Sequence, residues 1–169
     1  MESNVANERT LNSMKRTIVV LVVVLLVLFG AIQLVPGPSR DNPPSVAPAR
    51  FPADVEVVVR TACMDCHSNE TNWPWYSAVA PFSWYVTRDV LVARSHLNFS
   101  NWEAVPAETQ LDMLTKVWNG VVERRMPHKQ YALMHPAVEL TAEERKVIRD
   151  WTFALMEELS GQNTADVGN

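Results

Sequence analysis

The sequence is poor in cysteine, in basic charge and in strand-forming patterns, and each shortage excludes a class of protein. Only two cysteines occur among the 169 residues, so the chain has no second cysteine pair for a four-cysteine zinc site. The formal net charge is −4, which leaves no basic footprint for nucleic acid. No alternating run of β-branched residues indicates a strand. These absences predict a helical protein that does not bind nucleic acid.

Hydrophobic residues are abundant, and many of them are concentrated in one segment. Residues 17–35 read TIVVLVVVLLVLFGAIQLV and would cover roughly 28 Å as a helix, close to the thickness of a bilayer's hydrocarbon core. The run is longer than the apolar part of a signal peptide and no A-x-A pattern follows it, so we expect an uncleaved transmembrane anchor rather than a cleaved signal. Lys15 and Arg16 precede the run, which places residues 1–16 in the cytoplasm and the rest of the chain outside.

Proline marks the boundary between the anchor and the folded part of the chain. Six of the eleven prolines lie between residues 36 and 52. Proline favours extended backbone, so we expect residues 36–50 to form a semi-rigid linker. The folded domain then occupies residues 51–160, and the polar residues 161–169 form a flexible tail.

Apolar residues recur at helical spacing in four places of this domain. The stripes are Val55, Val58, Val59 and Ala62; Phe82, Val86, Val90, Ala93 and Leu97; Leu111, Leu114, Val117, Trp118 and Val121; and Val147, Ile148, Trp151, Leu155 and Leu159. Before the fourth stripe, Thr141 and Glu144 have the spacing of a capping box, which marks the start of a helix. The sequence therefore predicts an all-α domain of four short helices behind one N-terminal transmembrane helix.

The two cysteines and one histidine form a single short motif. Cys63 and Cys66 are about one helical turn apart, so both thiols can point the same way, and His67 follows directly. Two thiols at this spacing can add to the two vinyl groups of a porphyrin while the imidazole reaches its iron, and C-x-x-C-H is the attachment sequence of c-type haem. We therefore expect one covalent haem c per chain, with His67 as an iron ligand.

Two other uses of the cysteine pair compete with haem. A thioredoxin-like dithiol belongs in a βαβ context, which this sequence does not have. Zinc would need two more ligands from His96, His128 and His135, which lack the usual paired spacing. An exported thiol pair without a cofactor would also tend to oxidise to a disulfide. Haem attachment is the favoured interpretation.

Longer stretches around this motif resemble the bacterial haem-binding domain family related to cytochrome c. The similar segments are CMDCHSNET, WPWY, LNFSNW at 97–102, MPHKQY and HPAVELTAEE, and they span about residues 51–155. The resemblance implies a cytochrome c-like helical fold that carries covalent haem in the periplasm, here attached to the bacterial inner membrane as a single-pass protein. It does not define a physiological reaction.

An iron bound only by His67 would have one open face, which electron carriers usually fill with methionine or histidine. Met126 is followed by proline after a predicted helix, as the axial methionine of cytochromes c is, and its separation from His67 resembles that of small cytochromes c. We predict Met126 as the second metal ligand. His128, Met134 and His135 are the alternatives, and histidine stays open because the family often has proline at position 128.

Six aromatic residues follow the attachment motif, namely Trp73, Trp75, Tyr76, Phe82, Trp84 and Tyr85. We expect these residues either to cover the porphyrin, with a Trp or Tyr hydrogen-bonded to a propionate, or to pack in the core. In a small haem domain the two roles coincide, because packing against haem is core packing. Arg94 and Lys129 are interpreted as solvated surface charges rather than as partners of the propionates.

The first hypothesis for function is a membrane-anchored periplasmic cytochrome that exchanges electrons with periplasmic or inner-membrane redox partners. In this hypothesis Cys63 and Cys66 tether the haem, and His67 and Met126 ligate the iron. One alternative is a peroxidase-like haem enzyme, which needs an openable iron face. The other is a haem-based redox sensor. The available methionine favours the carrier over the enzyme, and no signalling domain supports the sensor.

Overall fold

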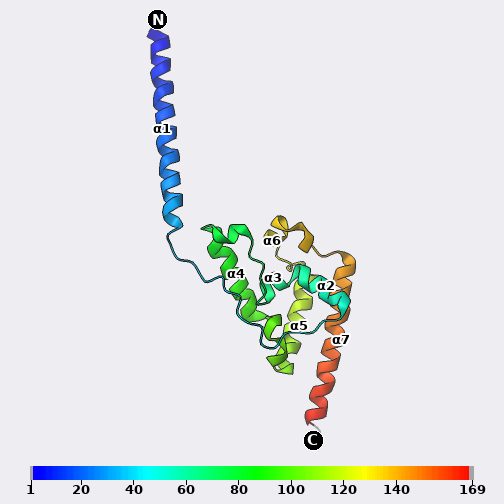
Figure 1. The fold of residues 1–169 in the computed structure, drawn as a ribbon. Helices are drawn as coiled ribbons and strands as arrows, with labels where there is room; N and C mark the ends of the chain where they lie inside the picture. The colour runs from blue at the N-terminus through cyan, green and yellow to red at the C-terminus, as the bar shows by residue number, and fades with distance from the viewer. Residues whose placement is uncertain (1, 168–169) are drawn as a thin grey trace. The chain divides into compact units, whose positions relative to one another are not determined.

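The computed structural model describes residues 2–167, with side chains described from residue 11 to residue 161. Residue 1 of the expected cytoplasmic segment and residues 168–169 of the expected tail lie outside this range. Every regular element in the described range is a helix, as predicted. The elements, drawn in Figure 1, are α1 (Glu2–Ile32), α2 (Ala53–Ala62), α3 (Met64–His67), η1 (Trp75–Ala78), α4 (Phe82–His96), η2 (Phe99–Ala104), α5 (Ala107–Val122), α6 (Lys129–Met134), η3 (Pro136–Val138) and α7 (Ala142–Val167).

The four helices predicted from apolar spacing are all present, as α2, α4, α5 and α7. The capping box that starts α7 is also present: the N–H of Thr141 donates to Glu144 Oε2 (2.7 Å), and the N–H of Glu144 donates to Thr141 Oγ1 (3.2 Å). The same helix continues to Val167, into the segment expected to be a flexible tail. The short helices α3 and α6 were not predicted, because elements of 4 and 6 residues show no apolar periodicity.

The chain divides into two compact units. Unit 1 comprises Met1–Pro38 and Trp75–Val86, and unit 2 comprises Ser39–Pro74 and Thr87–Asn169. Unit 1 contains α1, whose segment Leu11–Ile32 has a mean hydropathy of 2.5 and is not buried against other parts of the protein. By length and composition this helix is either a membrane anchor or a signal sequence.

The hydrophobic core of unit 2 lies between α2, α5 and α7. Helices α5 and α7 pack along each other, and α2 packs against α7 (Figure 1). Each of the three helices contributes a fully buried aliphatic side chain, Val59 from α2, Leu114 from α5 and Ile148 from α7. These residues all belong to the predicted apolar stripes, so the periodicity of the sequence correctly identified the buried face of each helix.

Part of the proline-rich segment is hydrogen-bonded to unit 2. The N–H groups of Val46 and Ala47 donate to the carbonyl of Ser100 (3.2 Å each), and the N–H of Ala49 donates to the carbonyl of Phe99 (2.8 Å). Proline itself has no N–H to donate, but the residues between the prolines keep theirs. The second half of the expected linker is therefore packed onto η2 as part of the folded unit.

Two valines of α2 provide a matched test of this core. Val59 is 1% exposed, whereas Val57 is 66% exposed. We expect Val59→Ala to lower the free energy of unfolding by about 2 kcal/mol, because the lost methyl groups leave a cavity. Val57→Ala should change it by less than about 0.5 kcal/mol. Denaturant unfolding followed by circular dichroism measures both, and equal effects would contradict the assignment of the buried face.

Candidate functional site

The motif from Cys63 to His67 consists of the residue that follows α2 and the one-turn helix α3. Helix α2 ends at Ala62, Cys63 links it to α3, and α3 carries Cys66 and His67. The carbonyl of Cys63 accepts the N–H groups of Cys66 (3.2 Å) and His67 (2.9 Å). These bonds keep the two half-buried cysteines one turn apart, which is the spacing on which haem attachment depends.

The imidazole of His67 is oriented by the main chain of a distant segment. Its Nδ1 lies 3.1 Å from the carbonyl oxygen of Leu97, just after α4. A carbonyl oxygen can only accept, so Nδ1 carries the proton and Nε2 keeps a free lone pair. Burial lowers the pKa of His67 from its usual value, and this favours the neutral imidazole that binds metals. His67 therefore has the tautomer and the protonation state that an iron ligand requires.

The two thiols are kept neutral by their surroundings. Burial, with a smaller effect of Cys66, raises the pKa of Cys63 to about 12. Burial, reinforced by the nearby carboxylates of Asp65 and Asp89, raises the pKa of Cys66 to about 11. Thioredoxin-like dithiols work instead with a lowered thiol pKa. This environment does not favour the dithiol alternative.

A polar network joins the segment after His67 to the segment that holds its Leu97 partner. The N–H of Asn69 donates to Ser100 Oγ (2.9 Å), and Asn98 Nδ2 donates to Asn69 Oδ1 (2.8 Å). Asn98 Oδ1 accepts the N–H of Ser100 (3.0 Å). Asn69 and Ser100 are buried, so their polar groups depend on these partners. The network fixes the Leu97 carbonyl against the imidazole.

Arg94 joins three segments of unit 2 and corrects one expectation. Its guanidinium donates four hydrogen bonds, to the carbonyls of Ser68 (2.7 Å) and Asp41 (2.8 Å), to Asn42 Oδ1 (2.8 Å) and to Thr71 Oγ1 (2.7 Å). The interpretation of Arg94 as a solvated surface charge is therefore wrong. Four of its five donors are in use, so it is a structural clamp beside the attachment turn rather than a free partner for a propionate.

The four candidates for the second iron ligand lie in one segment between α5 and α7. Met126 follows α5; its N–H donates to the carbonyl of Gly120 (2.9 Å), and the residue is 43% exposed. A side chain at position 120 would crowd it, because an added Cβ there would lie 3.3 Å from Met126 Cγ. His128 precedes α6, Met134 is its last residue and His135 follows it. Met126 as the second iron ligand stays a prediction.

The segment between α5 and α7 holds the candidates for the second, distal iron ligand and is called the distal segment below. It is fixed at its middle and at both ends. Tyr131 Oη donates to Asp65 Oδ2 at 2.5 Å, which ties α6 to the turn that carries the cysteines. Arg145 donates from Nη1 to the carbonyl of Val121 (2.8 Å) and from Nη2 to the carbonyl of Leu140 (3.2 Å). The sequence did not predict the contact of Tyr131 or the two contacts of Arg145. The tyrosine lies in the MPHKQY segment, but nothing in that pattern indicates its partner.

The aromatic cluster is less buried than expected. Trp75, Phe82 and Tyr85 are 77%, 64% and 57% exposed, so the expectation of core packing is wrong for these three residues of unit 1. Trp73, in unit 2, has a buried indole N–H that finds no hydrogen-bond partner among the described residues. A buried indole N–H normally has an acceptor. Trp73 is therefore a donor that a propionate of a bound porphyrin could use.

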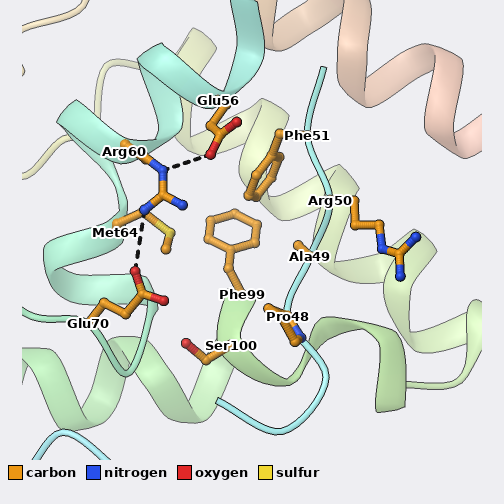
Figure 2. A pocket seen from close by; sticks show the side chains of 10 residues that line it. All are labelled: Pro48, Ala49, Arg50, Phe51, Glu56, Arg60, Met64, Glu70, Phe99 and Ser100. Carbon is orange, nitrogen blue, oxygen red and sulfur yellow. Dashed lines mark hydrogen bonds and ion pairs between the residues drawn. The ribbon is translucent and has the colours of Figure 1, made fainter. Parts of the chain in front are cut away.

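A pocket of about 290 Å³ lies beside α3 but does not include the attachment residues (Figure 2). Met64, between the two cysteines, lines it together with Phe51 and Phe99, whereas Cys63, Cys66 and His67 do not. Its Arg60 is paired with Glu56 (2.8 Å) and Glu70 (3.3 Å), and these exposed pairs contribute little to stability. The pocket therefore shares Met64 with the motif but includes neither its two cysteines nor its histidine.

The motif residues fit a c-type haem by their chemistry. Two neutral thiols lie one turn apart, the neighbouring imidazole keeps Nε2 free, and a buried N–H of Trp73 needs an acceptor. Comparison with known proteins supports haem binding: the model of the haem-binding domain family matches residues 26–154. No curated protein and no solved structure matches the chain.

Arg94 offers a test of the clamp beside the motif. Arg94→Lys keeps the positive charge but removes the planar set of donors, so we expect the free energy of unfolding to fall by about 2 kcal/mol. Arg88→Lys, at an exposed position of the same helix, should change it by less than about 0.5 kcal/mol. Denaturant unfolding of both variants measures the difference. If the Arg94 variant were as stable as the wild type, the hydrogen bonds of Arg94 would make no net contribution to the free energy of unfolding.

Proposed function

The chain belongs to the haem-binding domain family, and we propose that it is a membrane-anchored c-type cytochrome that carries single electrons in the bacterial periplasm. The observation that supports this most directly is the state of His67. Its Nδ1 is bonded to the Leu97 carbonyl, which leaves Nε2 free on the same turn that presents two thiols. A hydrogen bond that fixes the tautomer and the orientation of the imidazole suits a histidine that binds iron permanently.

Cys63 and Cys66 would hold the porphyrin through thioether bonds. A covalent tether suits a protein outside the cytoplasm, because a dissociated cofactor could not be recovered there. The raised pKa values, about 12 for Cys63 and about 11 for Cys66, keep both side chains as neutral thiols, and each would supply the sulfur and the hydrogen that addition to a vinyl group requires. Trp73 would donate its indole N–H to a propionate.

Met126 would be the second protein ligand of the iron, with His67 as the first. A thioether ligand raises the reduction potential of a haem and blocks the face where small molecules would otherwise bind. When bound, the haem would supply one-electron ferric/ferrous redox chemistry. The protein's contribution is to hold both ligands at fixed positions, which Tyr131 and Arg145 support by fixing the distal segment.

The apolar helix α1 would serve as an uncleaved anchor in the inner membrane. Lys15 and Arg16 on its N-terminal side favour a cytoplasmic N-terminus. The family match begins at residue 26, inside the apolar run, so the part shared with the family includes the end of this helix. An anchored carrier would stay close to redox partners in the membrane or the adjacent periplasm.

A second candidate function is a peroxidase-like haem enzyme. The observation that favours it is the 43% exposure of Met126, since an exposed ligand can leave the iron and open the distal face. His128 or His135 would then act as the distal acid–base group. Rapid cyanide binding to the ferric protein would favour this enzyme, and slow binding would favour the carrier.

The proposal is tested on the full-length protein made in a bacterium that matures c-type cytochromes. We expect haem to stay on the chain through denaturing electrophoresis, a pyridine haemochrome spectrum typical of two thioether bonds, and a reversible one-electron potentiometric titration. The Cys63→Ala, Cys66→Ala double variant should lose haem on denaturation. Haem that dissociates from the wild-type chain on denaturation would disprove covalent attachment. A haem that cannot be reduced and reoxidised reversibly would disprove electron transfer.

A pair of methionine variants tests the distal ligand. Met126→Ala should lower the midpoint potential by on the order of 100 mV, change the low-temperature EPR spectrum and accelerate cyanide binding, because the iron loses its thioether. Met134→Ala, another exposed methionine in the same segment, is the matched control and should change none of these. The opposite pattern would assign Met134 instead. No effect of either variant would leave His128 and His135, which glutamine substitutions would then separate.

A further inference from the structure

Beyond its first 16 residues, unit 1 contains no charged residue. Neither residues 17–38 nor residues 75–86 include Asp, Glu, Lys, Arg or His. The second stretch reads WYSAVAPFSWYV and forms η1 and the first turn of α4. The surface of a water-soluble domain normally mixes charges with apolar groups. A charge-free stretch that includes both surface and aromatic residues indicates an environment other than bulk water.

A side chain at the end of α1 fixes residues 75–86 to the membrane helix. Gln33 follows α1 directly; its Oε1 accepts the N–H of Ala80 (2.9 Å), and its Nε2 donates to the carbonyl of Ala80 (3.1 Å). The same Nε2 donates to the carbonyl of Phe29 (3.1 Å) inside the helix. One carboxamide therefore pairs with both main-chain groups of a single residue, and Ala80 itself is buried.

A second contact lies four residues further along the chain. A Cβ placed on Gly37 would lie 2.4 Å from Cδ1 of Trp84, closer than any side chain allows. Glycine is thus required for the backbone to approach the indole this closely. The contacts of Gln33 and Gly37 hold residues 75–86 beside the C-terminal end of α1.

Three large aromatic residues of this stretch are exposed. Trp75 is 77% exposed, Phe82 64% and Tyr85 57%. Close to the end of α1, Leu34 and Val35 are also exposed, at 85% and 52%. Aromatic residues of this kind, Trp and Tyr above all, gather where a bilayer meets water, because the ring is apolar and its N–H or O–H stays near polar head groups.

We propose that residues 75–86 are a membrane-docking element, whose Trp75, Phe82 and Tyr85 insert into the head-group boundary of the bilayer that α1 spans. The proposal rests on the proposed anchoring of the protein by α1. The occupant of this surface is lipid, since the element is tied to the last turn of a membrane helix and carries no charge for a polar partner. The cytochrome would then touch the membrane through two segments distant in sequence.

Photolabelling from lipid tests this on the full-length haem protein. The protein is placed in vesicles of phosphatidylethanolamine and phosphatidylglycerol that contain a phospholipid with a diazirine near its head group. After illumination, mass spectrometry maps the labelled peptides. We expect label in the C-terminal part of α1 and in residues 75–86, and several-fold less in α5 and α7.

Variants separate docking from mere proximity. Gln33→Ala should reduce labelling of residues 75–86 several-fold and leave labelling of α1 unchanged, because only the tie is removed. The Trp75→Ser, Phe82→Ser double variant should reduce it similarly without changing the haem absorption spectrum. Phe153→Ser, at a residue 49% exposed on α7, is the matched control and should have no effect on labelling.

Each other outcome overturns the inference in a distinguishable way. Label in α1 with none in residues 75–86 refutes docking and leaves the anchor intact. No label in either segment refutes the anchor, and docking falls with it. A changed haem spectrum in the Trp75, Phe82 variant with unchanged lipid labelling would mean that these rings line the cofactor. Protection of residues 75–86 together with a dimeric mass would mean that a second copy covers them.

Discussion

The hydrogen bond between His67 and the carbonyl of Leu97 is the contact on which the rest of the site depends. It selects the imidazole tautomer, and the tautomer decides whether Nε2 can bind a metal at all. The bond joins two stretches that are 30 positions apart in the sequence, so the fold must bring α3 to the end of α4 before the imidazole is held in this tautomer. The polar side chains of Asn69, Asn98 and Ser100 help to hold these two stretches together.

Polar contacts hold α3 against the end of α4. Asn69, Asn98 and Ser100 bond to one another, and Arg94 draws the start of unit 2 onto the turn after His67. Buried polar groups that are all satisfied tolerate few rearrangements, because any shift leaves a donor or an acceptor unpaired. The hydrophobic core between α2, α5 and α7 supplies stability, and the polar network supplies the position of the histidine.

The sequence predicted the parts of this protein that depend on spacing. The four helices of the domain and the capping box at Thr141 could be predicted because each is a local pattern of side-chain types. The partner of His67 could not, since a backbone carbonyl such as that of Leu97 has no signature in the sequence. Arg94 was misjudged for the same reason, as two of its four acceptors are main-chain carbonyls. The exposure of Phe82 was missed because apolar spacing shows which residues share a helix face. It does not show whether another part of the protein covers that face.

The pairing of Gln33 with Ala80 closes the chain into a ring of 47 positions, and the attachment sequence lies inside that ring. The entropy lost on closing such a ring grows only with the logarithm of its length, so the closure needs few contacts to persist. The order of events during maturation then matters. A cofactor joined to the cysteines early meets an open strand, whereas one joined late must enter a loop whose two ends are already fastened together. If haem is attached as proposed, the contact between Gln33 and Ala80 at the end of α1 would thereby affect how the cofactor reaches the cysteines.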